Sequence, residues 1–239
     1  MASTNTLQRT VNVTQNFIRS APLTGIGGIP NEPALSIGDW IRNFILSPPF
    51  AWRWNRGTTS FNTAPGTVDY QVNIPNFGWL EKAALVDTTV NNITSRELTV
   101  AMNLGLELAP NETGNIAARL DDDQGNVTFR ITPPSNTATV INIDYQLASP
   151  NFVALTDTWN PIPDYLSFLY NQAFLAKAYE YWNDERFPNT MQVFIGSLIS
   201  ANGGLSESQK NIFTQPEFND ARQKMALTAP TSRSAKGIF

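Results

Sequence analysis

The chain has 239 residues, of which 41% are hydrophobic and 15% are charged, a balance that excludes a disordered protein and is typical of a globular one. It contains no cysteine and no histidine, which excludes thiol nucleophiles, imidazole acid–base catalysis, Ser-His-Asp triads and structural zinc held by these residues. The net charge of −4 argues against a protein that coats nucleic acid electrostatically.

The chain opens with a segment that predicts two helices and a loop. Residues 1–6 lack the basic and then apolar pattern of a signal sequence, and no apolar run reaches bilayer length, so we expect a soluble, non-exported protein. A first helix is expected over 5–19, and 21–33 reads as a Gly/Pro-rich loop. A second helix over 35–46 has apolar residues at the spacing of one buried face: Ile37, Trp40, Ile41, Phe44 and Ile45. The first helix places Leu7, Val11, Thr14, Phe17 and Ile18 near one side.

From residue 51 to residue 148 the apolar period changes from 3.6 to 2. In four stretches apolar residues alternate with polar or small ones, and these stretches begin at Val68, Leu98, Val127 and Thr139. Alternation indicates strands with one packed face and one wet face, so we expect an antiparallel β-sandwich or small barrel. Turns are expected at Asn55-Arg56-Gly57, Pro65-Gly66, Asp121 to Gly125 and Pro133-Pro134.

After Pro150 the helical period returns, and the segment from Trp159 to Trp182 is its centre. Pro161 and Pro163 suit a helix entrance, where Asp164 is expected to cap the free amides. Polar residues are scattered around the helix that follows, which indicates burial on several sides. We therefore expect it to be the axis of the fold and to meet another copy of the chain through Phe168, Tyr170, Phe174 and Tyr181.

A second C-terminal helix and a basic tail complete the chain. The helix places Met191, Phe194, Ile195, Leu198 and Ile199 on one face and stops at Asn202-Gly203-Gly204. The basic tail has three possible interpretations: a solvated disordered end, a nucleic-acid contact, or a segment that orders on a protein partner. The apolar end favours the last interpretation, with residues 228–239 as an extended partner-binding arm. The expected binding residues are Arg222 and Lys224 ahead of the arm and Arg233, Lys236, Ile238 and Phe239 within it.

Candidate chemical sites are few, and each has an ordinary structural interpretation. Asp121-Asp122-Asp123-Gln124-Gly125 is acidic, but its glycine falls one place early for a calcium loop and no distal Glu follows, so a hairpin turn is preferred. Trp52, Trp54 and Trp79 could stack on sugars, although sandwich core is the simpler interpretation. No catalytic, cofactor-binding or metal residue is predicted, and we expect a protein that is not an enzyme.

The order of these pieces resembles the head-to-tail adaptor (connector or neck) proteins of short-tailed bacteriophages. The resemblance covers about residues 35–200. It rests on Phe50-Ala-Trp-Arg-Trp-Asn-Arg after an amphipathic helix, a β insert closing on Tyr145 and Pro150, and Leu155-Thr-Asp-Thr-Trp-Asn-Pro-Ile-Pro-Asp-Tyr. Tyr170-Asn-Gln-Ala-Phe-Leu-Ala-Lys-Ala-Tyr ahead of Asp184-Glu-Arg-Phe completes it.

The resemblance implies a dodecameric ring, assembled in the host cytoplasm and located at the head–tail junction of the virion. The C-terminal arm would bind the portal protein, and the β lobe would hold the tail nozzle and tail fibres. DNA would pass through the lumen without sequence-specific binding. No membrane contact and no cofactor are implied.

We therefore predict an α+β fold. Residues 1–50 and 149–227 would form a helical bundle, the adaptor domain, from the N- and C-terminal helices, with the β domain 51–148 inserted. The nearest alternative is a tail-nozzle or tail-completion ring protein. An alternative from a different functional class is a carbohydrate-binding β-sandwich on a helical stalk, which would need exposed tryptophans. An enzyme that acts through carboxylates or Tyr is the least favoured alternative.

Overall fold

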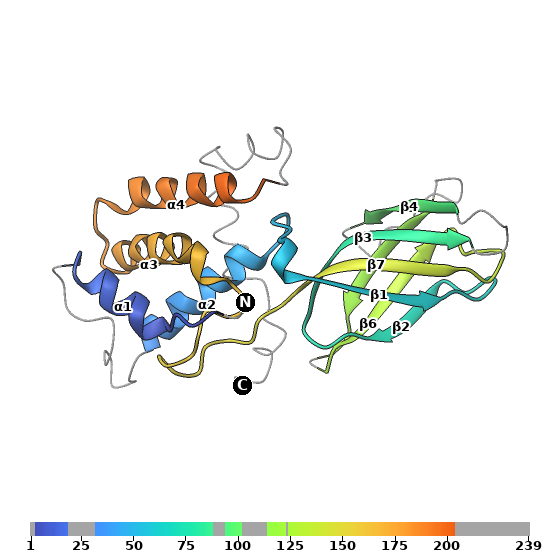
Figure 1. The fold of residues 1–239 in the computed structure, drawn as a ribbon, viewed down its shortest axis with the longest axis horizontal. Coiled ribbons are helices and arrows are strands. Elements are labelled where there is room, and N and C mark those ends of the chain that lie inside the picture. The colour runs from blue at the N-terminus through green and yellow to red at the C-terminus, as the bar shows by residue number, and fades with distance from the viewer. Residues whose placement is uncertain (1–2, 19–31, 88–93, 102–113, 123, 204–239) are drawn as a thin grey trace. The chain divides into compact units, whose positions relative to one another are not determined.

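The computed structural model describes residues 3–18, 32–87, 94–101, 114–122 and 124–203, which form two compact units of an α+β chain (Figure 1). One unit, here the helical unit, contains the described residues up to Phe50 and from Ser149 onward. The other, the β unit, contains those from Ala51 to Ala148. The change from a 3.6 period to a 2 period thus predicts the α+β class correctly.

The β unit is one seven-stranded sheet in the order β1-β7-β3-β4-β5-β6-β2. Its strands are β1 (Arg56–Asn62), β2 (Asp69–Asn73), β3 (Phe77–Asp87), β4 (Thr94–Ala101), β5 (Asn115–Leu120), β6 (Asn126–Thr132) and β7 (Val140–Leu147). The pairs are antiparallel except β4–β5, where Val100 lies opposite Ile116 in a parallel register. The expectation of an entirely antiparallel module is wrong at this pair.

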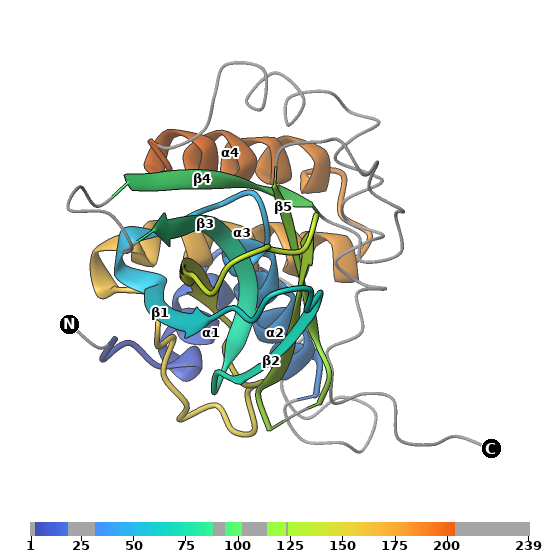
Figure 2. The same cartoon turned by 90° about the vertical axis from the view of Figure 1, so that its right-hand side faces the viewer.

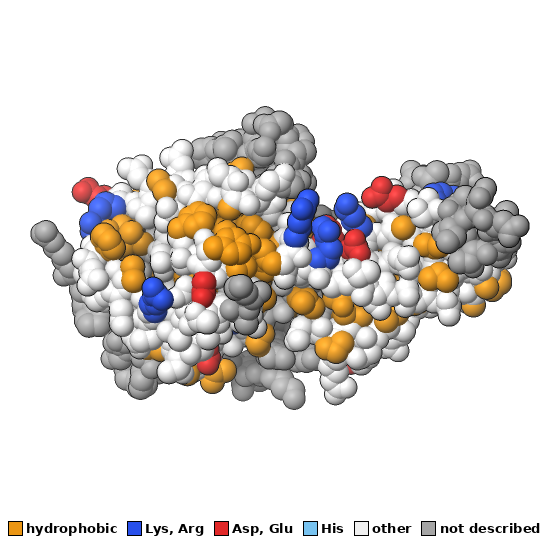
Figure 3. Space-filling view, viewed as in Figure 1, with side chains coloured by type: hydrophobic (Ala, Val, Ile, Leu, Met, Phe, Trp, Pro, Cys, Tyr) orange, Lys and Arg blue, Asp and Glu red, His pale blue; other side chains and the backbone are white. Residues whose placement is uncertain are grey.

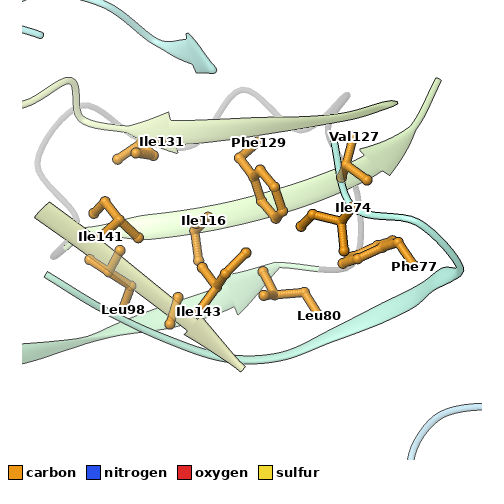
Figure 4. Packing of buried hydrophobic residues seen from close by; sticks show 11 residues of the cluster. Ile74, Phe77, Leu80, Leu98, Ile116, Val127, Phe129, Ile131, Ile141 and Ile143 are labelled. Carbon is orange, nitrogen blue, oxygen red and sulfur yellow. The ribbon is translucent and has the colours of Figure 1, made fainter. Parts of the chain in front are cut away.

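The sheet curls around a single apolar interior (Figure 2). Its two edge strands approach through side chains, since the rings of Phe61 on β1 and Tyr70 on β2 lie 5.5 Å apart. The labelled side chains in Figure 4 gather in one interior, from five strands and, in the case of Ile74, from the connection between β2 and β3. The buried cluster consists of Ile74, Phe77, Leu80, Ala83, Leu98, Ile116, Val127, Phe129, Ile131, Ile141 and Ile143. Alternation in β6 and β7 identified the inward residues of those strands correctly.

Two turns of the β unit test the sequence predictions. The segment Asp121 to Gly125 connects the antiparallel strands β5 and β6, as expected of a hairpin, although Asp123 itself is outside the described residues. Gly125 has φ +87°, which disfavours any residue with a side chain, and a Cβ there would also collide with the Ile74 carbonyl oxygen. The turn expected at Asn55-Arg56-Gly57 is wrong. A short 3₁₀ segment, η2, occupies Arg53–Asn55, and β1 begins at Arg56.

The helical unit has four helices: α1 (Leu7–Gln15), α2 (Glu32–Leu46), α3 (Ser167–Tyr181) and α4 (Phe187–Ala201). A 3₁₀ segment, η3 (Asp164–Leu166), precedes α3. Helix α3 packs against each of the other three helices. All five residues predicted for the inner face of α2 are buried, and so are four of the five predicted for α4, Ile199 being half-buried. On the first helix Phe17 is exposed, which corrects its expected inward position, because α1 ends at Gln15.

Candidate functional site

The stretch that follows Pro150 connects the N-terminal segment to α3 through one buried tryptophan. The Trp159 side chain is fully buried, and its ring stacks on that of Tyr170 with a centroid separation of 4.4 Å. Its Nε1 donates to Oγ1 of Thr10 on α1 at 2.9 Å. The Tyr170 hydroxyl in turn accepts from Nδ2 of Asn5 at 2.7 Å. The aromatic pair therefore has polar partners on its rim, which a buried indole and phenol require.

Asp164 has a different role from the helix cap that the sequence suggests. The cap position before η3 is Pro163, and no side chain bonds to the amides there. The Asp164 carboxylate instead accepts from the Ser3 and Thr4 hydroxyls at 2.7 and 2.6 Å and from the Thr4 and Asn5 backbone amides at 3.1 Å. It fixes the N-terminal segment to the start of α3. Sequence reasoning missed this because the partners lie about 160 positions apart.

These contacts also shift the acidity of two carboxyls in the helical unit. The hydroxyls of Ser3 and Thr4 hold the pKa of Asp164 well below its usual range, because they stabilise the ionised form. The pKa of Asp157 is lowered as well, chiefly by the backbone amides of Ala154 and Val153. Both carboxylates hold a loop or a terminus in place. Their shifts therefore report structural anchoring.

Arg42 ties α2 to the same stretch of chain. The guanidinium is buried over the ring of Phe152, 3.4 Å from its centroid, and donates to the carbonyls of Pro150 and Thr158 at 2.5 and 2.7 Å. Burial lowers the pKa of Arg42 to about 10, with Asp39 and Asp157 acting in the opposite direction. The group stays charged at neutral pH, so it serves as a fixed donor for main-chain carbonyls.

Burial around α3 divides the residues predicted to contact another copy of the chain. Tyr170 and Phe174 are 1% and 0% exposed, so they pack inside their own helical unit and have no surface left for a second chain. Phe168 and Tyr181 remain exposed, at 44% and 47%. The expectation of contact through Tyr170 and Phe174 is therefore wrong, because α1, α2 and α4 already cover that side of the helix.

One side of α3 is less covered than the rest. In its first turns Phe168, Asn171, Gln172 and Leu175 share one side and are exposed or half-buried. Tyr179 on the same side is buried, and Trp182, the residue that ends the helix, is half-buried. Tyr165, just before the helix, is 70% exposed. We define the open stripe as Tyr165, Phe168, Asn171, Gln172, Leu175 and Trp182. It carries no charged residue and three aromatic rings, a composition typical of the centre of a protein interface.

Exposed large hydrophobic side chains of the described chain are confined to the helical unit. They lie in its helices or in the connecting segments: Val13, Phe17, Val153, Tyr165, Phe168, Tyr181 and Val193. In the view of Figure 3, the largest groups of hydrophobic side chains on the helical unit lie near α3. Single exposed hydrophobic side chains are ordinary on a protein surface; those beside one another at the start of α3, Tyr165 and Phe168, are the ones of interest.

The three tryptophans considered for sugar binding lie in the β unit. Trp52 is buried and stacks on Trp54 with a centroid separation of 5.3 Å. Trp54 and Trp79 are half-buried. A sugar-binding platform needs an open aromatic face, which the buried ring of Trp52 does not offer. Trp52 is buried, as the core interpretation requires, although it precedes the first strand and lies outside the apolar cluster of the sheet.

In the acidic turn between β5 and β6, the described carboxylates form hydrogen bonds with neighbouring residues of the hairpin. The Asp122 carboxylate accepts from the Gln124 and Asn126 amides, and Asp121 bonds to Arg119 and Thr128. Among the residues that the structure describes, no group of three acidic side chains is placed to hold a metal ion. Within the same residues, none of the helices has the length and apolar character needed to cross a bilayer.

Several sequence predictions fall outside the described residues. The loop expected over 21–33 lies there apart from its last two residues. The apolar alternation beyond Ala101 and the proposed arm residues from Arg222 to Phe239 lie there entirely.

The sequence was also compared with known proteins. No protein-family model matches the chain. Nor does any curated protein match it.

Proposed function

We propose that the protein is a non-enzymatic structural component of a virion, a head-to-tail adaptor whose identical copies form a ring between the portal and the tail. The observation that carries this proposal is the open stripe, an uncharged surface with three aromatic rings and two amides that the described helical unit leaves partly uncovered. A face of this kind on an isolated chain is costly in water and is stabilised when identical neighbours cover it.

The proposal assigns a role to each part of the chain. The N- and C-terminal helices form the bundle that lines or surrounds the DNA channel, and the inserted β domain reaches the tail nozzle or fibres. Negative net charge suits a lumen through which DNA slides, because few cations are available to hold phosphate. The arm 228–239 orders on the portal, which restricts assembly to a portal that is ready to receive it.

The β unit supports a separate role for itself. Among its described residues no large hydrophobic side chain is exposed, and its interior holds a cluster of buried hydrophobic residues. Its described surface lacks large exposed hydrophobic side chains, which suits contacts that form after the ring has assembled. The helical unit holds the apolar surface, so the ring contacts are assigned to it.

Native mass spectrometry and negative-stain imaging test the ring directly, with the purified protein alone and mixed with its portal. We expect a closed ring in at least one condition, whereas a persistent monomer in both would refute the proposal. Phe168→Asp should abolish assembly and leave the melting temperature within about 2 °C of the wild-type value, since this side chain is partly exposed. Val153→Asp is the matched control, because Val153 is 85% exposed and lies outside the open stripe.

The arm has its own test. Removal of residues 228–239 should abolish portal binding and leave the melting temperature nearly unchanged, because a segment that orders only on its partner adds little to the stability of the free chain. A truncated protein that still binds the portal with wild-type affinity would show that the arm is not the portal contact.

A further inference from the structure

The curled sheet of the β unit does not close, and two unpaired strand edges border the gap. Strands β1 and β2 end the strand order, and no described strand pairs with the outer edge of either one. Their side chains meet beneath the gap, where the rings of Phe61 and Tyr70 lie 5.5 Å apart. Over most of their length, however, the Cα atoms of β1 and β2 are more than 8 Å apart. We call the gap between these two edges the seam.

The width of the seam admits one further strand. Neighbouring strands lie about 4.8 Å apart, so two strands that hold a third between them are separated by about 10 Å. A separation beyond 8 Å is too wide for β1 to pair directly with β2. The rings of Phe61 and Tyr70 are nevertheless in contact across the seam, which limits its width from above.

The ladder between β1 and β7 shows which backbone groups of β1 face the seam. The Thr63 amide, just after β1, donates to the Thr139 carbonyl. Hydrogen-bonded pairs alternate along an antiparallel ladder, so the amides and carbonyls of Thr58, Ser60 and Asn62 point away from β7 and into the seam. Within the described chain these groups have no backbone partner.

The edge of β2 is free in the same way. The Ile131 amide donates to the Val68 carbonyl just before β2, and the alternation that follows turns the backbone groups of Asp69, Gln71 and Asn73 away from β6. Two rows of unpaired amides and carbonyls therefore border one seam. An extended backbone satisfies both rows at once, because it carries hydrogen-bonding groups on its two sides.

Neither edge has the features by which proteins protect an exposed strand, such as proline, lysine or a bulge. After Arg56, β1 reads Gly-Thr-Thr-Ser-Phe-Asn, and after Asp69, β2 reads Tyr-Gln-Val-Asn. Arg56 and Asp69 are themselves engaged by Glu81 and Arg130. The central part of both edges is therefore uncharged and open to an added strand.

The inward-facing residues along the seam are incompletely covered. No residue of β1 or β2 is buried, whereas each of the other described strands contributes at least one buried residue. Phe61, Tyr70 and Val72 pack against the buried cluster but are only half-buried themselves. A strand added in the seam would place apolar side chains over them.

We propose that the seam binds an extended segment of another protein, which adds as a further strand between β1 and β2. The segment spans five to seven residues, the lengths of β2 and β1. Because β1 and β2 run in opposite directions, it pairs parallel with one edge and antiparallel with the other. Its apolar side chains alternate inward with polar ones that face solvent. This inference concerns the β unit alone and does not depend on the proposed ring.

The two facing edges select this kind of partner. A strand held between two edges needs both of its own edges free. Every described strand of this chain already pairs along at least one edge, so the described strands of a second copy cannot enter the seam. A helix uses its backbone groups internally and cannot pair with either edge. The occupant is therefore a segment that is unpaired until it binds, such as an extended terminus or linker.

Peptide selection on the full-length chain tests the seam. A displayed library of random heptapeptides is selected against the wild-type protein, and the enriched peptides are synthesised with a fluorescent label for anisotropy titrations. We expect the enriched sequences to alternate apolar and polar residues and to bind saturably. N-methylation of alternate peptide amides keeps the side chains and removes backbone donors, so it should weaken binding at least about tenfold.

Variants of the two edges locate the bound peptide. Ser60→Pro removes an amide that faces the seam and none that bonds to β7, so the chain should fold and bind the peptide at least about tenfold more weakly. Ser60→Ala keeps the amide and should bind as the wild type does. Gln71→Pro is the equivalent change on β2. Circular dichroism and the melting temperature establish that each variant is folded.

Several results would overturn the proposal. Failure of the library to enrich any peptide, wild-type affinity of both proline variants, or undiminished binding of the N-methylated peptides would each show that no strand pairs in the seam. A wild-type dimer that both proline variants abolish would assign the edges to a second copy instead. If neither proline variant folds, the comparison of N-methylated with unmodified peptides on the wild-type chain decides the question.

Discussion

Replacement of Trp159 should destabilise the helical unit more than almost any other single change. A fully buried Trp removes roughly 150–250 Å² from water, and large-to-small changes at such sites cost about 3–5 kcal/mol. The Trp159 ring also stacks on Tyr170 and donates to Thr10. We therefore expect Trp159→Ala to lower the free energy of unfolding of the helical unit by about 4 kcal/mol.

A double-mutant cycle separates the hydrogen bond from the packing. Trp159→Phe keeps a stacked ring and loses the bond, at about 2 kcal/mol; Thr10→Val leaves the indole donor buried without a partner, at about 1–2 kcal/mol. The double variant should cost about 1 kcal/mol less than the sum, because no polar group is then left unpaired.

Urea unfolding followed by far-UV circular dichroism at helix wavelengths measures these values. Phe17→Ala is the control, since that ring is mostly exposed and its loss should change stability by less than about 0.5 kcal/mol. A cost below about 1.5 kcal/mol for Trp159→Ala, or strict additivity in the cycle, would refute the role assigned to this side chain.

Three further outcomes are expected. Gly57→Ala should destabilise the β unit by about 1–3 kcal/mol, measured as a lower urea midpoint, because the new Cβ would lie 2.4 Å from the ring of Tyr145. Folding lowers the pKa values of Asp157 and Asp164, so both ionised carboxylates stabilise the folded state above the unfolded pKa of about 3.9. This stabilisation is lost as the pH falls through the folded pKa values. In acid titrations, Asp164→Asn should therefore lose less stability below pH ~4 than the wild type does. Arg42→Lys should lower the free energy of unfolding by about 1–3 kcal/mol in thermal or urea unfolding, because a lysine ammonium cannot donate to both carbonyls with the geometry of the guanidinium. Equal stability of the variant and the wild type would show that these two hydrogen bonds are dispensable.

The surface of α3 that we propose for assembly could be predicted only in part from the sequence. A helix with polar residues scattered around its wheel predicts burial on several sides, and α3 is indeed covered by three other helices. Which ring remains outside depends on how those helices pack. Phe168 stays exposed and Phe174 does not, although both are Phe on one helix. The orientation of each neighbour decides this, and the sequence of α3 does not encode it.

What the sequence by itself determined is the set of elements with regular periodicity: the buried faces of α2 and α4 and the inward residues of β6 and β7. Strand β3 was missed because register shifts at Phe77/Trp79 and Leu80/Lys82 interrupt its alternation. Tertiary structure alone decided the parallel pairing of β4 with β5 and the bond from Asp164 to residues near the N-terminus. The physical reason is distance along the chain. Periodicity shows only which nearby residues share one face of a helix or strand, whereas strand pairing and long-range hydrogen bonds depend on packing between segments far apart in the sequence.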